Sequence, residues 1–298
     1  MEFDIYNPKC QVFQVDSDIV KSAYNELDNY LIISDEKSEK KKTPMCVLYF
    51  SGHSIYFPNE GSTFENEIIK KNRFEWYGMR IKEAEKHIFL RDIHKQWYLS
   101  GINAKINSPE KLLFFLEKET DGYDIVCVGS SAGGYAAILY GSLLGAKCVY
   151  AFSPRLEMHS LDKYSEESVN PIYFRLRNTE RKKYMELHTY IKGSKVPMYC
   201  FYPINSFLDK LQLEYINQYQ IDNNPNFHMI KFNTWKHGVP FPKVALMPIL
   251  QITPALSEFE NKINNPILFS IQVVGIIKTV SGIWKQLKKR YFPNFCKS

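Results

Sequence analysis

The sequence lacks the features that mark several common classes of protein. Its six cysteines include no C-x-x-C pair, and its seven histidines show no spacing of the kind that binds zinc. No G-x-G-x-x-G occurs, and no lysine follows a glycine-rich turn as it does in a P-loop. These absences argue against a metal centre and a nucleotide-binding loop, so we expect no metal site and no permanently bound cofactor.

Targeting segments are also missing. The first residues show no basic stretch followed by an apolar one, so we expect no secretory signal. The apolar stretch at residues 266–277 is too short to cross a bilayer. Four cysteines lie in apolar, strand-like runs and are expected to be buried free thiols of a reducing compartment: Cys46, Cys127, Cys148 and Cys200. We therefore expect a cytoplasmic protein.

The composition is that of a globular protein with a mixed α/β architecture. The chain has 298 residues, 45% of them apolar and 23% charged, which is enough to build a large core. Buried strand-like runs alternate with helical patterns, which predicts a mostly parallel sheet with helices on both faces. The net charge of +6 is modest and does not suggest a nucleic-acid partner.

The glycine-rich stretch 123–134, YDIVCVGSSAGG, gives the strongest indication of function. Its first part is a short apolar run, as expected of a strand buried on both faces. Residues 129–133 then match G-x-S-x-G with Ser131 at the centre, and a helical pattern follows directly. This is the context of a nucleophilic serine, in which the backbone N–H of Ala132 would bind an oxyanion. The alternative is a glycine-rich turn that cradles a phosphate.

A second turn and an insertion complete the expected site. The predicted strand Pro44–Phe50 ends in the turn SGHS, and we assign the second oxyanion donor to the backbone near His53. The aromatic run Phe74–Tyr77 suggests a further strand. Residues 155–195 interrupt the alternation and are rich in charge and tyrosine, which is typical of a lid over a site.

A serine nucleophile needs a base, because a free hydroxyl is a poor nucleophile at neutral pH. Where a nucleophilic serine stands on a turn between a strand and a helix (a nucleophile elbow), the acid and then the histidine follow it in the chain, each after a strand. His237 fits this position, since it comes just after the last clear strand, Phe227–Phe232. His228 lies inside that strand, and His159 and His188 precede the strand expected to carry the acid.

The acid should follow the predicted strand Val196–Tyr202. Asp209 lies in the next helical segment and is the residue we choose to orient His237. Asp222 is an alternative, but it lies in a polar turn in which aspartate is favoured for turn formation. Glu214 would lie deeper in the helix.

Together the GSSAGG elbow, the SGHS turn, Asp209 and the WKHG loop resemble the α/β-hydrolase superfamily. More narrowly, they are similar to the bacterial capsular-polysaccharide O-acetyltransferases built on that fold. The resemblance covers roughly residues 44–245. It implies that acetyl-CoA is a donor substrate, that a polysaccharide hydroxyl is the acceptor, and that Ser131 carries the acetyl group. His237 would be the base and Asp209 the orienting acid.

Two other functions remain open from the sequence. A serine esterase or deacetylase would use the same three residues with water in place of the sugar hydroxyl. A scaffold without catalytic activity would bind a glycan or a glycosyltransferase, although it would need no complete triad.

The C-terminal segment is expected to lie outside the catalytic domain. We place the α/β-hydrolase domain at residues 1–250, with its lid at 155–195, and a helical tail at 251–298. Within residues 266–292, an apolar stretch continues into a segment that also carries a basic cluster: Lys285, Lys288, Lys289 and Arg290. This pattern indicates either a buried helix or dimer contact, or an amphipathic segment on the anionic inner face of the cell membrane.

Overall fold

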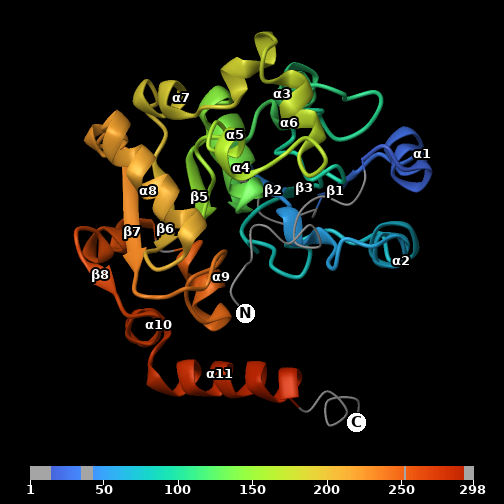
Figure 1. Ribbon diagram of the computed structural model, residues 1–298. Coiled ribbons are helices and arrows are strands. Elements are labelled where there is room, and N and C mark those ends of the chain that lie inside the picture. The colour runs from blue at the N-terminus through green and yellow to red at the C-terminus, as the bar shows by residue number, and fades with distance from the viewer. Residues whose placement is uncertain (1–14, 35–42, 252, 292–298) are drawn as a thin grey trace.

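An eight-stranded sheet forms the centre of the computed structural model, which describes residues 15–34, 43–251 and 253–291 (Figure 1). The strands lie in the order β1-β3-β2-β4-β5-β6-β7-β8. β1 runs antiparallel to β3, and the other pairings of this sheet are parallel. The strands are β1 (Tyr30–Ser34), β2 (Met45–Phe50), β3 (Lys86–Leu90), β4 (Asp124–Ser130), β5 (Cys148–Phe152), β6 (Met198–Pro203), β7 (Phe227–Phe232) and β8 (Ile263–Asn264).

Both faces of this sheet are buried, which explains the continuous apolar runs in the sequence. Successive residues of a strand point to opposite faces. In β2, Cys46, Leu48 and Phe50 belong to one hydrophobic cluster, whereas Val47 and Tyr49 belong to a second one. All five side chains are fully buried. The mostly parallel sheet predicted from the sequence is therefore confirmed.

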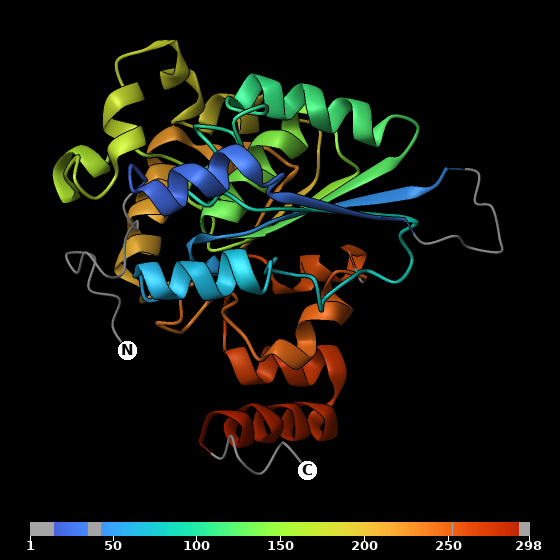
Figure 2. The ribbon, with the colours of Figure 1, turned by 90° about the vertical axis from the view of Figure 1, so that its right-hand side faces the viewer.

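Helices cover the two faces of the sheet (Figure 2). α3, α4 and α8 contribute to the first cluster, and α9 and α10 contribute to the second. The helices are α1 (Asp18–Glu26), α2 (Gly61–Phe64), α3 (Pro109–Thr120), α4 (Ala132–Leu143), α5 (Leu161–Tyr164), α6 (Pro171–Leu176), α7 (His188–Lys192), α8 (Phe207–Tyr219), α9 (Leu246–Ile249), α10 (Pro266–Val274) and α11 (Ile276–Tyr291). Short 3₁₀ or π-helical turns are η2 (His53–Ile55), η3 (Glu65–Lys70), η4 (Glu180–Tyr184), η5 (Ile221–Asn223), η6 (Lys243–Ala245) and η7 (Thr253–Phe259).

The predicted strand at Phe74–Tyr77 is wrong, because these residues form a turn. Trp76 has a φ of 68°, which is incompatible with a strand. Its indole N–H donates a hydrogen bond to the carbonyl oxygen of Phe50 over 3.1 Å. The aromatic residues thus anchor a loop against the end of β2 and do not pair in the sheet.

The C-terminal helices α10 and α11 lie beneath one face of the sheet (Figures 1 and 2). Gly275, with a φ of 84°, separates the two helices. Phe269 of α10 is buried in the second hydrophobic cluster, and β8 pairs with β7. None of the described helices combines the length and the apolarity that crossing a bilayer requires. The domain boundary at residue 250 stays a prediction.

Four cysteines lie on four adjacent strands at the centre of the sheet. They are Cys46 in β2, Cys127 in β4, Cys148 in β5 and Cys200 in β6, and all are free and buried, as predicted. Removal from water is the main reason why the pKa of each thiol is raised above its usual value.

Candidate active site

Ser131 stands on a sharp turn between β4 and α4. Its backbone has φ 55° and ψ −117°, a conformation that is strained for any residue with a side chain. The backbone N–H of Ser131 donates to the carbonyl oxygen of Phe152 at the end of β5, over 2.8 Å. The turn is therefore fixed to the neighbouring strand, and Ser131 lies at the carboxyl edge of the sheet.

Glycines around Ser131 allow the backbone to pass this closely. A Cβ atom at Gly129 would lie 2.0 Å from the carbonyl oxygen of Gly133. A Cβ atom at Gly133 would lie 2.1 Å from the carbonyl oxygen of Phe50 at the end of β2. Neither position has room for a side chain, so the glycines of the G-x-S-x-G sequence are required by the packing of α4 against β2 and β4.

Ser131, His237 and Asp209 form a continuous chain of hydrogen bonds. The Oγ atom of Ser131 lies 2.9 Å from Nε2 of His237, and Nδ1 of His237 lies 2.8 Å from Oδ2 of Asp209. A carboxylate only accepts hydrogen bonds, so the Nδ1 proton faces Asp209 and the Nε2 lone pair faces the serine hydroxyl. The structure thus brings together the three residues selected from the sequence, in the geometry of a nucleophile, a base and an orienting acid.

Asp209 is fully buried, in contrast to the alternative acid. It lies in the first turn of α8, where the partial positive charge of the helix N-terminus favours a carboxylate. Asp222 is exposed and lies in η5. The other histidines weighed from the sequence have partners of their own, since His228 lies 3.0 Å from Glu260 and His188 lies 2.7 Å from the hydroxyl of Tyr215.

The loop that carries His237 is held by Ser153. The Ser153 hydroxyl accepts the backbone N–H of Gly238 and donates to the carbonyl oxygen of the same residue, each over 3.0 Å. Gly238 has a φ of 90°, which favours glycine. Sequence reasoning missed Ser153, although its position directly after β5 places it at the same edge of the sheet as Ser131.

Two backbone N–H groups near Ser131 are the ones expected from the sequence to bind an oxyanion, those of Ala132 and His53. Ala132 is the first residue of α4, so its N–H has no carbonyl partner within the helix. His53 begins η2, just after β2. Gly52, next to it, packs on the end of β4, because a Cβ atom there would lie 2.6 Å from the carbonyl oxygen of Ser130. The structure therefore places Gly52, the residue before His53, against the serine elbow.

A partly buried carboxylate holds the turn around His53. Glu75 accepts the backbone N–H of Gly52 over 2.6 Å and also the hydroxyl of Ser54. Burial raises the pKa of the Glu75 carboxyl, and these two hydrogen bonds act in the opposite direction. Glu75 falls in the segment expected to be a strand, so nothing in the sequence indicated that it holds this turn.

The His53 ring faces the pocket as a neutral imidazole. Burial is the main cause that lowers its pKa well below the usual value, and the neighbouring cations Lys95 and Arg155 add to the effect. Within the described residues, the buried Nε2 atom of His53 has no hydrogen-bond partner. The ring lies 4.8 Å from that of Trp97. The ring therefore forms part of the pocket wall together with Trp97.

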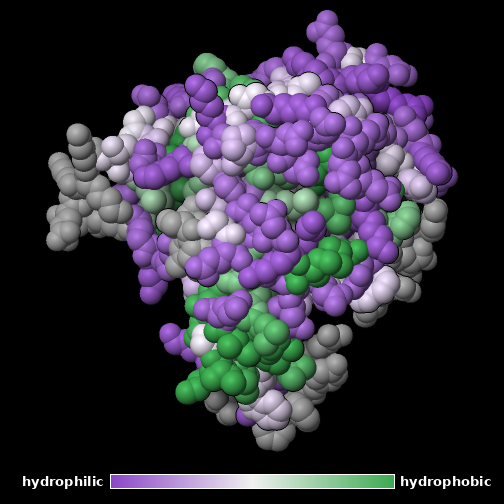
Figure 3. Space-filling model, turned by 90° about the vertical axis from the view of Figure 1, so that its left-hand side faces the viewer, coloured by the Kyte–Doolittle hydropathy of each residue, from purple (hydrophilic) through white to green (hydrophobic). Residues whose placement is uncertain are grey.

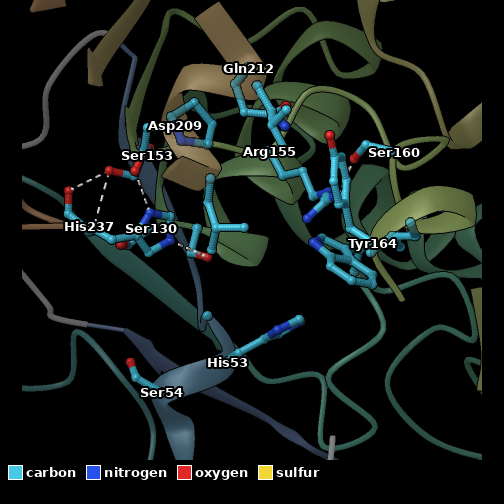
Figure 4. Close-up of a pocket in the computed structure, with 18 of the residues that line it drawn as sticks. His53, Ser54, Ser130, Ser153, Arg155, Ser160, Tyr164, Asp209, Gln212 and His237 are labelled. Atoms are coloured by element: carbon cyan, nitrogen blue, oxygen red, sulfur yellow. Dashed lines mark hydrogen bonds and ion pairs between the residues drawn. The ribbon is translucent and has the colours of Figure 1, made fainter. Parts of the chain in front are cut away.

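The pocket above Ser131 has a volume of about 390 Å³. Figure 4 shows His237, Ser153 and Ser130 on one side and Arg155, Ser160 and Tyr164 on the other. Ser160, Leu161 and Tyr164 belong to the 155–195 segment, so part of the expected lid does line the pocket. Whether this segment opens and closes as a lid stays a prediction.

Arg155 provides a positive charge in the pocket wall. Its guanidinium donates to the hydroxyl of Ser160 over 2.6 Å and to the carbonyl oxygen of Glu157 over 2.8 Å, and it lies 5.3 Å from the centre of the Trp97 ring. Burial lowers the pKa of Arg155, and the carboxylate of Glu157 opposes this effect. Arginine is suited to bind an anionic or carbonyl group of a substrate.

No group of three His, Cys, Asp or Glu side chains that could hold a metal ion occurs in the part of the chain that the structure describes.

Comparisons with known proteins gave structural similarities only. No family model and no curated protein sequence matches the chain. Among solved structures, it is similar to the capsule O-acetyltransferase of Neisseria meningitidis serogroup A, with 13% identity over 66% of this chain and 81% of that one and a TM-score of 0.46.

Two further structures are similar at the same level. A protein of unknown function from Staphylococcus aureus shows 12% identity over 77% of this chain and 94% of that one, with a TM-score of 0.49. Esterase B from Lactobacillus rhamnosis shows 14% identity over 80% and 90%, with a TM-score of 0.44.

The fold itself follows from this chain's own topology. A mostly parallel sheet with an antiparallel edge strand, a serine elbow between β4 and α4, and the chain order serine, aspartate, histidine together make an α/β-hydrolase fold. The chemistry of the site rests on the residues described above, because identities this low say nothing about substrate.

Proposed function

We propose that the protein is an enzyme that transfers an acyl group through a covalent intermediate on Ser131. The observation that carries this proposal is the chain of hydrogen bonds from Ser131 through His237 to the buried Asp209, at the floor of a pocket. The strained backbone of Ser131 and its position at the N-terminus of α4 add to it, because they suit a nucleophile and the binding of an oxyanion.

The first half of the reaction acylates the serine. His237 Nε2 takes the proton of the Ser131 hydroxyl while Oγ forms a bond to the carbonyl carbon of the donor. The N–H groups of Ala132 and His53 donate to the resulting oxyanion. The intermediate then collapses, the bond to the leaving group breaks, and the proton on Nε2 passes to that group as it departs.

The second half returns the serine. An acceptor hydroxyl gives its proton to Nε2 as its oxygen attacks the acyl carbon, and the bond to Ser131 Oγ breaks as the proton returns to that oxygen. Asp209 holds the imidazole in the required tautomer and stabilises the positive charge formed twice in this cycle.

We propose acetyl-CoA as the donor and a hydroxyl of a capsular or other surface polysaccharide as the acceptor. The resemblance of the elbow and the histidine loop to capsular O-acetyltransferases supports this assignment, as does Arg155, which suits an anionic donor. Aromatic side chains in the pocket wall, Trp97 and Tyr164, suit the apolar face of a sugar ring. The donor would be available in the cytoplasm, where we place the protein.

Hydrolysis is the second candidate. The His237 side chain is 19% exposed, so water has access to the base and can replace the sugar hydroxyl as the acceptor. The protein would then be a serine esterase or a deacetylase with the same acyl-enzyme.

Incubation with acetyl-CoA, with and without polysaccharide, tests both candidates. The transferase predicts CoA release that depends on the acceptor and an acetyl group on Ser131, detected by peptide mass spectrometry. The esterase predicts hydrolysis of aryl acetates at a rate that added polysaccharide does not change. Binding of polysaccharide without any turnover would reject both and leave a scaffold.

A further inference from the structure

The helices α10 and α11 carry an exposed apolar surface, seen as a green area at the lower end of the molecule in Figure 3. We call it the tail surface and define it by six residues: Ile267, Leu268, Ile276, Ile277, Val280 and Trp284. Each of them has at least half of its side chain exposed, and Ile277 reaches 81%. An apolar surface of this kind on a folded protein usually marks a site of interaction.

Most of the tail surface belongs to α11, whose other side packs on the protein. Thr279 of α11 is fully buried. Gly282 packs against Val244 of η6, since a Cβ atom at Gly282 would lie 2.7 Å from Cβ of Val244. Ile276, Val280 and Trp284 recur every fourth residue and therefore share the face that points away from this contact. The fold thus holds the apolar face of α11 outward.

The charge of the same segment has only one sign. Residues 266–298 contain six lysines and arginines and no aspartate or glutamate, a surplus equal to the net charge of +6 of the whole chain. Lys278, Lys285 and Lys288 are exposed beside the apolar face. The Lys288 ammonium lies 5.6 Å from the centre of the Trp284 ring, so charge and aromatic surface adjoin each other.

We propose that the tail surface docks on an anionic lipid membrane, with its apolar side chains among the acyl chains and its lysines on the lipid phosphates. Exposed apolar residues, a tryptophan and flanking lysines are the features of a helix that lies in the membrane interface. A symmetric contact between two copies is disfavoured, because it would bring these lysines together without any carboxylate of the segment to pair with them.

Membrane binding would leave the pocket accessible. None of the residues that line the pocket belongs to α10 or α11. The pocket lies beside Ser131 at the carboxyl edge of the sheet. The two helices lie beneath one face of the sheet (Figures 1 and 2). The proposal is therefore independent of the proposed reaction and is tested without measuring it.

Co-sedimentation with vesicles tests the proposal. The full chain is mixed with vesicles of phosphatidylcholine alone and of phosphatidylcholine with phosphatidylglycerol. Three variants are compared: the pair Ile277→Gln and Trp284→Gln, the pair Lys285→Gln and Lys288→Gln, and Phe114→Gln on α3. Phe114 is 71% exposed and is a matched control for loss of an exposed apolar side chain. Circular dichroism confirms that each variant is folded.

The wild-type protein should bind the anionic vesicles and bind the neutral ones much more weakly. Loss of Ile277 and Trp284 should reduce the partition coefficient at least about tenfold. Loss of two lysines should reduce the partition coefficient about 25-fold at low salt, from about fivefold for each charge near the surface. Phe114→Gln should bind as the wild type does.

Three results would overturn the proposal. The wild type fails to bind anionic vesicles, or it binds both kinds equally, or the Ile277 and Trp284 pair binds as the wild type does. Sedimentation equilibrium is run on the same samples. If that pair turns a dimer into a monomer and leaves vesicle binding unchanged, the tail surface is a contact between two copies of the chain.

Discussion

Glu75 accepts the backbone N–H of Gly52 over 2.6 Å, although the two residues are 23 positions apart in the chain. Through this bond and its contact with the hydroxyl of Ser54, the carboxylate holds the residues on either side of His53. Glu75 itself does not line the pocket. In the proposed reaction it is therefore a positioning residue for the N–H of His53, and it would act on the oxyanion without touching it.

Replacing Glu75 should affect the maximal rate more than substrate affinity. In Glu75→Ala the turn loses both hydrogen bonds, and we expect kcat to fall about 10- to 100-fold with little change in KM, since an oxyanion donor acts in the transition state. In Glu75→Gln the amide oxygen can still accept from Gly52, so most of the rate should return. Exposed Glu83→Ala is the control. A normal kcat in folded Glu75→Ala would show that the turn needs no carboxylate.

Ser131→Ala should abolish turnover while the protein stays folded, because the change removes the nucleophile and little volume. The loss should be about 10³-fold or more in kcat, measured with acetyl-CoA or an aryl acetate. Ser130→Ala is the matched control on the adjacent residue and should be far milder. Near-normal activity in Ser131→Ala would end the assignment of a serine nucleophile.

Asp209→Asn should lower kcat strongly and leave donor affinity almost unchanged. The amide keeps the shape of the side chain, but it removes the charge that stabilises the imidazolium and it can hold the wrong tautomer of His237. Asp222→Asn is the control and should be close to neutral, because Asp222 is exposed and asparagine also suits a turn. A large loss of kcat in Asp222→Asn with a near-normal kcat in Asp209→Asn would instead identify Asp222, in the turn before β7, as the acid.

Two buried groups in the segment after β3 should make the stability of the fold change with pH in opposite directions. Asp92 accepts the backbone N–H groups of His94, Gln96 and Tyr98 over 2.7–3.0 Å. Burial raises the pKa of Asp92 to about 6. Between about pH 4 and 6 the folded protein therefore binds one proton more at Asp92 than the unfolded protein does, and the contribution of Asp92 to the free energy of unfolding falls as the pH rises. Burial lowers the pKa of His94 to about 4, so its contribution to stability rises with pH over nearly the same range.

Single substitutions should reveal the separate contributions of Asp92 and His94 to the pH dependence of the free energy of unfolding. In the wild type the two contributions largely cancel between about pH 4 and 6. Asp92→Asn leaves the His94 slope, so the free energy of unfolding should rise with pH by up to about 3 kcal/mol. His94→Gln leaves the Asp92 slope, and the free energy should fall by a similar amount. Urea denaturation at four pH values gives both slopes, and parallel profiles in all three proteins would contradict this account.

Features that depend on neighbours in the chain were predictable from the sequence. The elbow at Ser131 follows from the glycines around it, because they leave room where a strand turns into a helix. Ser108 and Pro109 predict the start of α3, and the Ser108 hydroxyl does accept the backbone N–H of Lys111 over 3.2 Å. Asp209 and His237 were selected because the order of the acid and the base is set by the topology of the sheet.

Features that depend on distant residues were not predictable. Glu75 was assigned to a strand because its aromatic neighbours favour one, and nothing near it in the sequence indicates the turn that it holds. Ser153 and Gly238 lie 85 positions apart, and only the folded sheet brings them together. Arg155 falls in a charged insertion, where the sequence does not distinguish a solvated arginine from one in a pocket wall.

The reactivity of the four buried cysteines should report on the unfolding of the sheet. Burial raises the pKa of Cys46 to about 12 and that of Cys148 to about 11, so almost no reactive thiolate exists at neutral pH while the strands are closed. With Cys10 and Cys296, which lie outside the described residues, replaced by serine, each alkylation event must follow an opening of the sheet. Mass spectrometry of the labelled peptides would then time the exposure of β2, β4, β5 and β6 separately, without any probe added to the chain.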